Sequence, residues 1–337
     1  MNQAESNKSP TEEEIQKFIR IASKVDTEIK KVIVGQGAAI REVLIALFSG
    51  GHILLEGVPG LGKSLLVRTL GTVFQVSFSR IQFTPDLMPA DITGTNIVTE
   101  DSKGHRSFKF YNGPIFSNIV LADEINRATP KTQSALLEGM QEQTVSVGNE
   151  TLTLPAPFFV MATQNPIEME GTYPLPEAQL DRFFFKVNIP FPERQDMRII
   201  LDRTIRYDLP QVDVISDGPR MSEMIKLARN VPVMSYLKDF AVDLIMATHP
   251  SIENTSQEIK RYVKYGASPR GLQALIIGAQ VRGLMEGRYN VSEDDIRAVA
   301  LPALRHRISL NFEADIDNVT VDQIIENLLD SVQPTQS

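Results

Sequence analysis

The sequence predicts an α/β domain followed by a smaller helical domain, on three observations. Five short apolar runs, typical of buried strands, alternate with helical patterns in the first part of the chain. A glycine-rich segment separates the first run from the helix that follows it. After Pro192 the strand pattern fades, and helical periodicity continues almost to the end of the chain.

The strand and helix patterns give the elements of the first domain. The apolar runs are residues 53–55, 76–82, 119–122, 158–162 and 183–189. The helical patterns between them are 63–74, 130–142 and about 176–181. Because strands linked by helices pair in parallel, we expect a parallel sheet covered by helices on both faces. Before the first strand, Thr11 and Glu14 have the spacing of a capping box, and Val34-Gly35 ends the helix that they begin.

Two β-hairpins interrupt this alternation. The first pairs 96–100 with 107–111, and the second pairs 144–147 with 151–154 around Gly148-Asn149. Neither is needed to close an α/β core, so both are interpreted as insertions.

The later helices and the changes of pattern set the domain limits. Helices are expected at 221–230, 236–248, 269–286, 293–306 and 321–329. We therefore assign 1–192 to the α/β domain, with 1–10 disordered, and then 193–220 to a linker helix and loop, 221–312 to a small all-α domain, and 313–337 to a C-terminal helix and tail.

Composition restricts the possible functions. The chain has 337 residues and a net charge of −8, which gives no general attraction to nucleic acid or anionic lipid. It has no cysteine, which excludes disulfides, thiol catalysis and cysteine-bound metals and fits a cytoplasmic protein. The first residues are polar and acidic, unlike a secretory signal, and no apolar run reaches the roughly 18 residues that a membrane helix needs.

A complete phosphate-binding motif follows the first strand. The motif G-x-x-x-x-G-K-[ST] is formed by Gly57, Val58, Pro59, Gly60, Leu61, Gly62, Lys63 and Ser64. Its glycines let backbone N–H groups converge on phosphate oxygens at a helix N-terminus. Lys63 would contact the β- and γ-phosphates, and Ser64 would bind Mg²⁺. We include Leu65, the next residue of the helix, in the nucleotide-binding segment.

Polar residues at the ends of two further strands are candidates for the hydrolytic chemistry. Asp123 and Glu124 end the strand at 119–122, where Asp123 would hold Mg²⁺ and Glu124 would polarise the attacking water. The alternative, a pair that only caps a strand, is common for an isolated DE sequence. After the strand at 158–162, Asn165 is the first choice to contact the γ-phosphate and Gln164 the second. An Asn-Pro turn without ligand contact is the alternative.

These motifs resemble those of the MoxR family of AAA+ ATPases, in the helix-2-insert clade. The similarity is dense between about residues 51 and 186. The stretches that carry it are GVPGLGKS, IVLADEINRA, IQFTPDLMPADITG, GPIF and ATQNPIEMEGTYPLPEAQLDRF, with GASPRG and LRHR further on.

The resemblance implies a fold and roles for individual residues. It implies a five-stranded parallel sheet of order 5-1-4-3-2 with β-hairpin insertions and a four-helix lid. Asn165 would be sensor 1, Val34 and Gly35 would line the adenine pocket, and Arg182 would be an arginine finger inserted into a neighbouring subunit. Arg270 would be sensor 2, and we expect it to act in the subunit that binds the nucleotide. From spacing alone, both arginines would more often be surface ion-pair partners.

The resemblance also implies a function and partners. Such proteins bind ATP and Mg²⁺, assemble as rings, most often of six subunits, and remodel a client, often with a partner that contains a von Willebrand factor A domain. A magnesium-chelatase-like motor and an MCM-like DNA-dependent ATPase are the alternatives. The second hairpin has no Lys or Arg and carries Glu150, which disfavours nucleic acid, although the first hairpin contains Lys103, Arg106 and Lys109. A nucleotide switch without turnover is disfavoured by Glu124 and Arg182.

Several other residues have less specific interpretations. No two of the four histidines share a metal-ligand spacing, so surface or capping positions are expected. The cluster Arg305-His306-Arg307 is interpreted as a solvated helix end. Arg127 follows the two carboxylates. A position at a subunit interface and a position without a functional role are equally supported for it.

Overall fold

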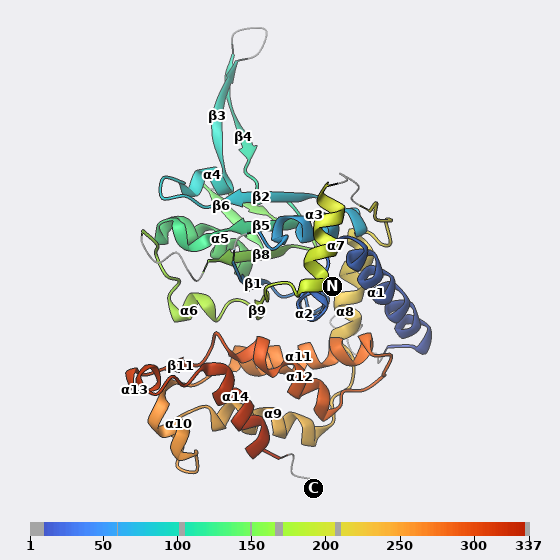
Figure 1. Ribbon diagram of the computed structural model, residues 1–337. Coiled ribbons are helices and arrows are strands. Elements are labelled where there is room, and N and C mark those ends of the chain that lie inside the picture. Colours follow the sequence, from blue (N-terminus) through green and yellow to red (C-terminus); the bar gives the residue numbers. More distant parts are fainter. Residues whose placement is uncertain are drawn as a thin grey trace, which may run out of the picture.

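The computed structural model describes residues 10–58, 60–100, 105–148, 150–165, 171–205 and 210–333. An α/β domain lies above a helical lid, and the β3–β4 hairpin extends from the α/β domain on the side away from the lid (Figure 1). Pro59 of the phosphate-binding motif and nearly all of the segment expected to be disordered lie outside the described residues.

The central sheet has five parallel strands. They are β1 (Ile53–Glu56), β2 (Phe78–Gln82), β5 (Ile119–Asp123), β8 (Phe159–Gln164) and β9 (Phe185–Asn188). Their spatial order is β2-β5-β8-β1-β9, and all neighbours pair in parallel. Numbered among themselves along the chain, the strands have the order 5-1-4-3-2, so the predicted sheet is confirmed.

The two faces of the sheet pack into separate cores, because successive side chains of a strand point to opposite faces. Ile53, Leu55, Leu121 and Phe185 pack into a core that continues through α1, α2 and α3 into the lid. The other face, which includes Leu54, packs against α4 and α5.

The helices of the α/β domain include those that the sequence predicts, together with α4 and η1, which it does not, and α7 is the predicted linker helix. They are α1 (Glu12–Val32), α2 (Gly37–Ser49), α3 (Lys63–Val73), α4 (Pro89–Thr93), a 3-10 turn η1 (Ile125–Arg127), α5 (Pro130–Glu142), α6 (Glu177–Leu180) and α7 (Arg194–Ile205). The capping box at α1 is confirmed, since Thr11 N donates to Glu14 Oε2 at 2.8 Å and Glu14 N donates to Thr11 Oγ1 at 3.3 Å.

Both predicted hairpins are present as separate two-stranded antiparallel sheets. They are β3 (Gly94–Glu100) with β4 (Arg106–Asn112), and β6 (Thr144–Val147) with β7 (Glu150–Thr153). The β3–β4 hairpin is long and exposes apolar side chains, with Phe108 79% exposed and Val98 58% exposed.

The lid is helical, with one short β pair that the sequence analysis did not predict. Its helices are α8 (Gly218–Arg229), α9 (Ser235–Ala247), α10 (Gln257–Tyr262), α11 (Pro269–Met285), α12 (Glu293–Leu304), α13 (Phe312–Ile316) and α14 (Val321–Ser331). Strands β10 (Val263–Tyr265) and β11 (Ser309–Leu310) pair antiparallel, and they are too short to give a periodic signal. Among the helices of the described residues, none is long and apolar enough to cross a bilayer.

Two histidines expected at the surface are buried, so that expectation was wrong for them. His52 and His306 are each 7% exposed. Val160 N donates to His52 Nδ1 at 3.0 Å, and His52 Nε2 lies 3.0 Å from Met140 O, so the neutral ring bridges β8 and α5. Burial lowers the pKa of His52 to about 4. Hydrogen bonds between residues about a hundred positions apart cannot be predicted from the local sequence, so the burial of His52 was not predicted.

Candidate functional site

The predicted nucleotide-binding residues gather at the carboxyl edge of the sheet. Lys63 follows β1, Asp123 ends β5, and Asn165 follows β8 directly. These strands are adjacent and parallel, so their carboxyl ends meet at one edge. In open α/β sheets this edge is where ligands bind.

The glycine-rich loop has the backbone conformation that a phosphate cradle needs. Gly60 has φ of 84° and Gly62 has φ of 78°, both in the left-handed region that favours glycine. Gly62 is the N-cap of α3, and among the described residues no side chain caps this helix end. The backbone N–H groups and the positive end of the helix dipole are therefore available to an anion.

Lys63 contacts the backbone of this loop. Its Nζ donates to Gly57 O at 2.5 Å. Partial burial lowers the pKa of Lys63, and the negative charges of Asp123, Glu124 and Glu56 partly offset that effect. A half-buried ammonium group surrounded by carboxylates fits contact with a polyphosphate.

Asp123 is oriented by two neighbours that the sequence analysis did not identify. Thr163 Oγ1 donates to Asp123 Oδ1 at 2.7 Å, and Arg80 Nη2 donates to Oδ2 at 2.6 Å. Arg80 comes from β2 and Thr163 from β8, the two strands that flank β5. The register pairs Gln82 with Asp123, so Arg80 lies two residues earlier on β2, and Thr163 follows Ala162, the partner of Ala122. A prediction of strand register could have used these positions.

Glu124 has a backbone conformation that is rare for a residue with a side chain. Its φ is 57°, and such outliers occur preferentially at functional sites. Glu124 N donates to Thr163 Oγ1 at 2.8 Å. Its Oε2 accepts from Gln82 Nε2 at 2.9 Å and from Arg127 Nη1 at 3.0 Å. Arg127 thus contacts the candidate catalytic carboxylate of its own chain.

Asn165 is buried at the same edge, with 7% exposure, and follows Gln164, the last residue of β8. Its position agrees with a contact to the γ-phosphate side of the site. The Pro166 of the Asn-Pro alternative lies outside the described residues.

An apolar cavity of about 350 Å³ adjoins the glycine-rich loop. Its lining includes Val34, Leu61, Leu65, Phe191 and Met197. A cavity of this size and character suits a planar base. Phe191 and Met197, from the segment around α7, were missed because nothing in the linker pattern indicates a base-binding role.

The segment between α1 and α2 is fixed against this cavity. Gln36 Nε2 donates to Leu61 O at 2.8 Å, which ties the segment to the phosphate loop. Gly35 has φ of 73°, and a Cβ there would lie 2.3 Å from Asp196 Oδ2 of α7. Gly35 therefore permits the close approach of α7, while Val34 lines the cavity itself.

The residues at this edge fit a magnesium ion bound together with a nucleotide. Ser64 in the first turn of α3 and Asp123 supply a hydroxyl and a carboxylate. Within the described part of the chain, no group of three or more His, Cys, Asp or Glu could hold a metal alone. Mg²⁺ in NTPases typically takes few protein ligands, and phosphate oxygens and water complete its coordination.

Arg182 lies at the opposite, amino edge of the sheet. It lies three residues before β9, whereas Lys63 follows β1, the parallel neighbour of β9. Arg182 Nη1 donates to Leu137 O of α5 at 3.0 Å. With Glu138 and Glu142 it lines a small hollow of about 220 Å³.

Arg270 lies beside Arg182 rather than beside Lys63. Arg270 Nη1 is 3.4 Å from Asp181 Oδ2, and Asp181 is the residue before Arg182. The structure thus places the Arg270 side chain against Asp181 and not against Lys63, and its expected role in the nucleotide site of its own chain stays a prediction. Spacing along the sequence could not show which edge of the sheet the first turn of α11 would approach.

In the Arg305-His306-Arg307 cluster, His306 and Arg307 are buried and Arg305 is half-buried, contrary to the expectation of a solvated helix end. Arg307 is 8% exposed, and its guanidinium bonds to the segment around Arg182. Arg305 binds Asp322 of α14, with Nη2 and Oδ2 3.0 Å apart. His306 and Arg307 bond to the segment 181–184 that precedes β9.

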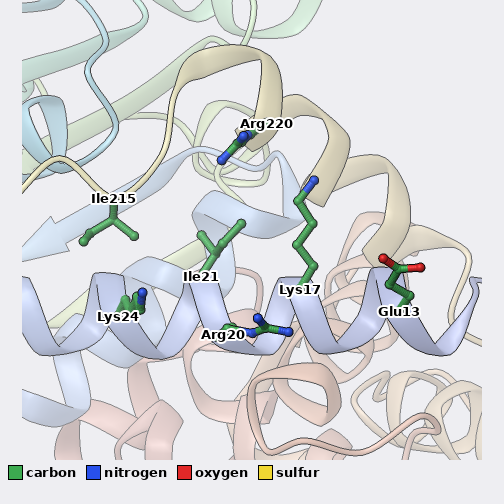
Figure 2. A pocket seen from close by; sticks show the side chains of 7 residues that line it. All are labelled: Glu13, Lys17, Arg20, Ile21, Lys24, Ile215 and Arg220. Atoms are coloured by element: carbon green, nitrogen blue, oxygen red, sulfur yellow. The ribbon is translucent and has the colours of Figure 1, made fainter.

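A separate hollow of about 390 Å³ lies along α1 (Figure 2). The charged residues that line it are Glu13, Lys17, Arg20, Lys24 and Arg220. Because its lining contains no residue of either sheet edge, we do not include this hollow in the candidate site.

Comparison with known proteins places the chain in a family. The model of the ATPase family associated with various cellular activities (AAA) matches residues 52–185, and a model of the AAA lid domain matches 256–328. The chaperone MoxR1 of Mycobacterium tuberculosis is 44% identical over 305 residues, which cover 90% of this chain and 80% of that protein. This chain belongs to the MoxR family of AAA+ ATPases.

Other relatives and a solved structure agree with this assignment. The protein MoxR of Methylorubrum extorquens is 29% identical, with 93% of this chain and 94% of that protein covered. A crystal structure of a protein from Cytophaga hutchinsonii superposes with a TM-score of 0.90 at 41% identity, and covers 96% of this chain and 98% of the other. The protein is an AAA+ ATPase with a lid domain of the same family.

Proposed function

We propose that this MoxR-family ATPase binds ATP and Mg²⁺ at the carboxyl edge of its sheet. The base occupies the cavity beside Val34 and Leu65, and the phosphates lie on the loop from Gly57 to Ser64. Lys63 contacts the β- and γ-phosphates, while Ser64 and Asp123 hold the ion, which neutralises phosphate charge when bound. Two observations support these roles: no side chain among the described residues caps the N-terminus of α3, and Lys63 lies near the carboxylates of Asp123, Glu124 and Glu56.

Glu124 and Asn165 act on the water that attacks the γ-phosphate. Glu124 accepts its proton or orients it, and Asn165 contacts both the water and the phosphate. Gln82 and Arg127 fix the direction of the Glu124 carboxylate, and Thr163 fixes its backbone.

The separation of the two sheet edges is the observation that carries the oligomeric part of the proposal. Arg182 and Arg270 lie together at the amino edge, and the nucleotide residues lie at the carboxyl edge. An arginine that stabilises charge developing on the γ-phosphate must reach it. Both arginines therefore serve the nucleotide of a neighbouring subunit. Head-to-tail contacts of this kind are heterologous and close into a ring, which we propose has six members.

ATP turnover drives chaperone-like remodelling of a client protein, with a von Willebrand factor A domain protein as partner, in the cytoplasm. The name of the Mycobacterium tuberculosis relative, chaperone MoxR1, supports this role. The exposed apolar residues of the β3–β4 hairpin give the ring a surface for a protein.

The remodelling role is tested with a variant that binds ATP without hydrolysing it. Glu124→Gln keeps the phosphate loop and should retain its client and partner in ATP. Lys63→Ala, which should not bind ATP tightly, is the matched control. Proteins recovered with Glu124→Gln and ATP, and absent with the control, would be identified by mass spectrometry. Equal recovery with both variants would contradict ATP-dependent client binding, and recovery of a magnesium-chelatase-type partner would support that alternative.

A further inference from the structure

The residue before the proposed arginine finger is held by three groups of the lid. Asp181 Oδ1 accepts from Ser268 Oγ at 2.7 Å and from Arg307 Nε at 2.9 Å. Its Oδ2 lies 3.4 Å from Arg270 Nη1. Ser268 is the N-cap of α11, Arg270 is in its first turn, and Arg307 follows α12. One carboxylate of the α/β domain thus receives contacts from two separate lid segments.

Arg307 also binds the backbone on both sides of Arg182. Its Nη2 donates to Asp181 O at 3.2 Å and to Phe183 O at 2.6 Å, and its Nη1 donates to Phe184 O at 3.1 Å. His306 Nε2 lies 2.9 Å from the same Phe183 O. The backbone that carries Arg182 is therefore fixed by the lid, while the Arg182 side chain extends to α5.

The guanidinium of Arg307 is costly to bury. Its side chain is 2% exposed, and burial lowers the pKa of Arg307 to about 10, with Asp181 acting in the opposite direction. A buried ion pair often contributes little net stability relative to apolar residues of similar size, and can instead specify one arrangement of the chain. Here the arrangement specified is that of the residues flanking Arg182.

We propose that the Asp181–Arg307 pair positions Arg182 for the site of the neighbouring subunit, and so couples the finger to the lid of its own subunit. This inference rests on the proposed function, in which Arg182 acts on the neighbour's nucleotide. Asp181 and Arg307 are positioning residues, because neither reaches the nucleotide of its own chain from this edge. A movement of the lid would shift the backbone of residues 181–184 and with it the finger.

Asp181→Asn tests the proposal. The amide can still accept from Ser268, but the charge opposite Arg307 and Arg270 is lost. A small displacement of a reacting group can cost about 100-fold, so we expect kcat for ATP to fall by about 10- to 100-fold. ATP affinity by calorimetry should stay within about threefold, since the nucleotide residues of the variant are intact.

The decisive readout is rescue by a subunit with an intact finger. Mixing Asp181→Asn with an excess of Lys63→Ala places an undisturbed Arg182 beside the intact phosphate loop of Asp181→Asn, so its turnover should rise. A merely structural defect inside the Asp181→Asn subunit would not respond to its neighbour. Arg307→Lys keeps the charge but loses the planar guanidinium that reaches three carbonyls of residues 181–184. It should show the same loss and the same rescue, and it tests the proposal if Asp181→Asn does not fold.

Two controls separate the possible outcomes. Asp322→Asn makes the same chemical change at the partner of Arg305 and should leave turnover within about twofold. Arg182→Ala mixed with Lys63→Ala reports on the proposed function alone. If subunits exchange and that mixture stays inactive, in a ring whose activity falls linearly as mutant subunits dilute wild type, the neighbour-acting part of the proposed function fails. Positioning of Arg182 by Asp181 and Arg307 is then judged by the separate effects of Asp181→Asn on kcat and ATP affinity. Wild-type turnover by both positioning variants, or a loss that intact fingers do not rescue while Arg182→Ala is rescued, would overturn the proposal.

Discussion

The carboxyl and amino edges of the same sheet differ in how their functional groups are held. At the carboxyl edge, the phosphate loop is one continuous segment between β1 and α3, and Asp123 and Glu124 end an adjacent strand. At the amino edge, Arg182 sits on a short connection whose geometry depends on Ser268, Arg270 and Arg307 of the lid. Under the proposed function, nucleotide binding is thus built into the α/β domain, whereas the arginines proposed to serve a neighbour depend on the lid.

The largest expected effect is the loss of turnover when Arg182 of the amino edge is removed, which differs from the loss of ATP binding expected at the carboxyl edge. Arg182→Ala should lower kcat by about 10³- to 10⁵-fold, the range typical of an arginine finger, because the charge it meets develops during phosphoryl transfer. Its ATP affinity should change little. Lys63→Ala should instead abolish tight ATP binding. Steady-state ATPase assays and calorimetry on both variants check the pair, and equal ATP affinities for the two would contradict the division of roles.

Arg270 gives a second test of the difference between the two edges, because its side chain lies at the amino edge. Arg270→Ala should lower kcat on the order of 10²-fold, as the loss of one group that stabilises the transition state does. Mixing it with Lys63→Ala should restore turnover. Mixing it with Arg182→Ala should not, since neither subunit then offers both arginines. Recovery of activity in the second mixture would show that Arg270 serves its own subunit.

The α/β core also has a pH dependence that comes from a buried histidine. The pKa of His52 is about 4 when folded, against an ordinary value of 6.5, so the unfolded chain binds more protons between these values. Stability should therefore be fully present above pH 6.5 and decrease as pH falls toward 4, by about 3 kcal/mol for this group. Urea unfolding between pH 7 and 5 should show a steeper loss for wild type than for His52→Gln. If wild type and His52→Gln lose stability equally as pH falls, His52 is not the cause of the loss.

The smallest expected effect concerns nucleic acid. The chain has a net charge of −8, and the exposed Glu150 begins β7 of the second hairpin. DNA should therefore leave ATP turnover within about twofold of its value without DNA at physiological salt. A several-fold stimulation by single- or double-stranded DNA would favour the MCM-like alternative.

The sequence predicted the carboxyl edge well because its signals are local. Strand periodicity, the glycine spacing and the DE pair lie in short segments, and the structure brings them to one edge in the predicted strand order. The roles of the individual residues stay predictions. Arg80, Gln82 and Thr163, which orient the carboxylates, could be found only through the register of neighbouring strands.

The amino edge could not be predicted in the same way, because it is assembled from distant parts of the chain. Arg307 lies 126 residues from Asp181, and Ser268 lies 87 residues from it. A local pattern of Arg-His-Arg at a helix end is compatible with solvent exposure, whereas His306 and Arg307 are buried and bond to residues 181–183. The contact of Arg270 with Asp181 could not be predicted for the same reason, since capping at Ser268 fixes a helix start without fixing its neighbours.

Complementation between two inactive proteins tests the central claim most directly. Arg182→Ala keeps its phosphate loop, and Lys63→Ala keeps its finger. In a random 1:1 ring, about one quarter of the heterologous interfaces would pair an intact loop with an intact finger. Mixing should restore measurable ATP hydrolysis, with subunit exchange verified by co-purification of two tags. Exchange without any recovery, in a ring whose activity falls linearly as mutant subunits dilute wild type, would contradict the central claim, because Arg182 would then act within its own subunit.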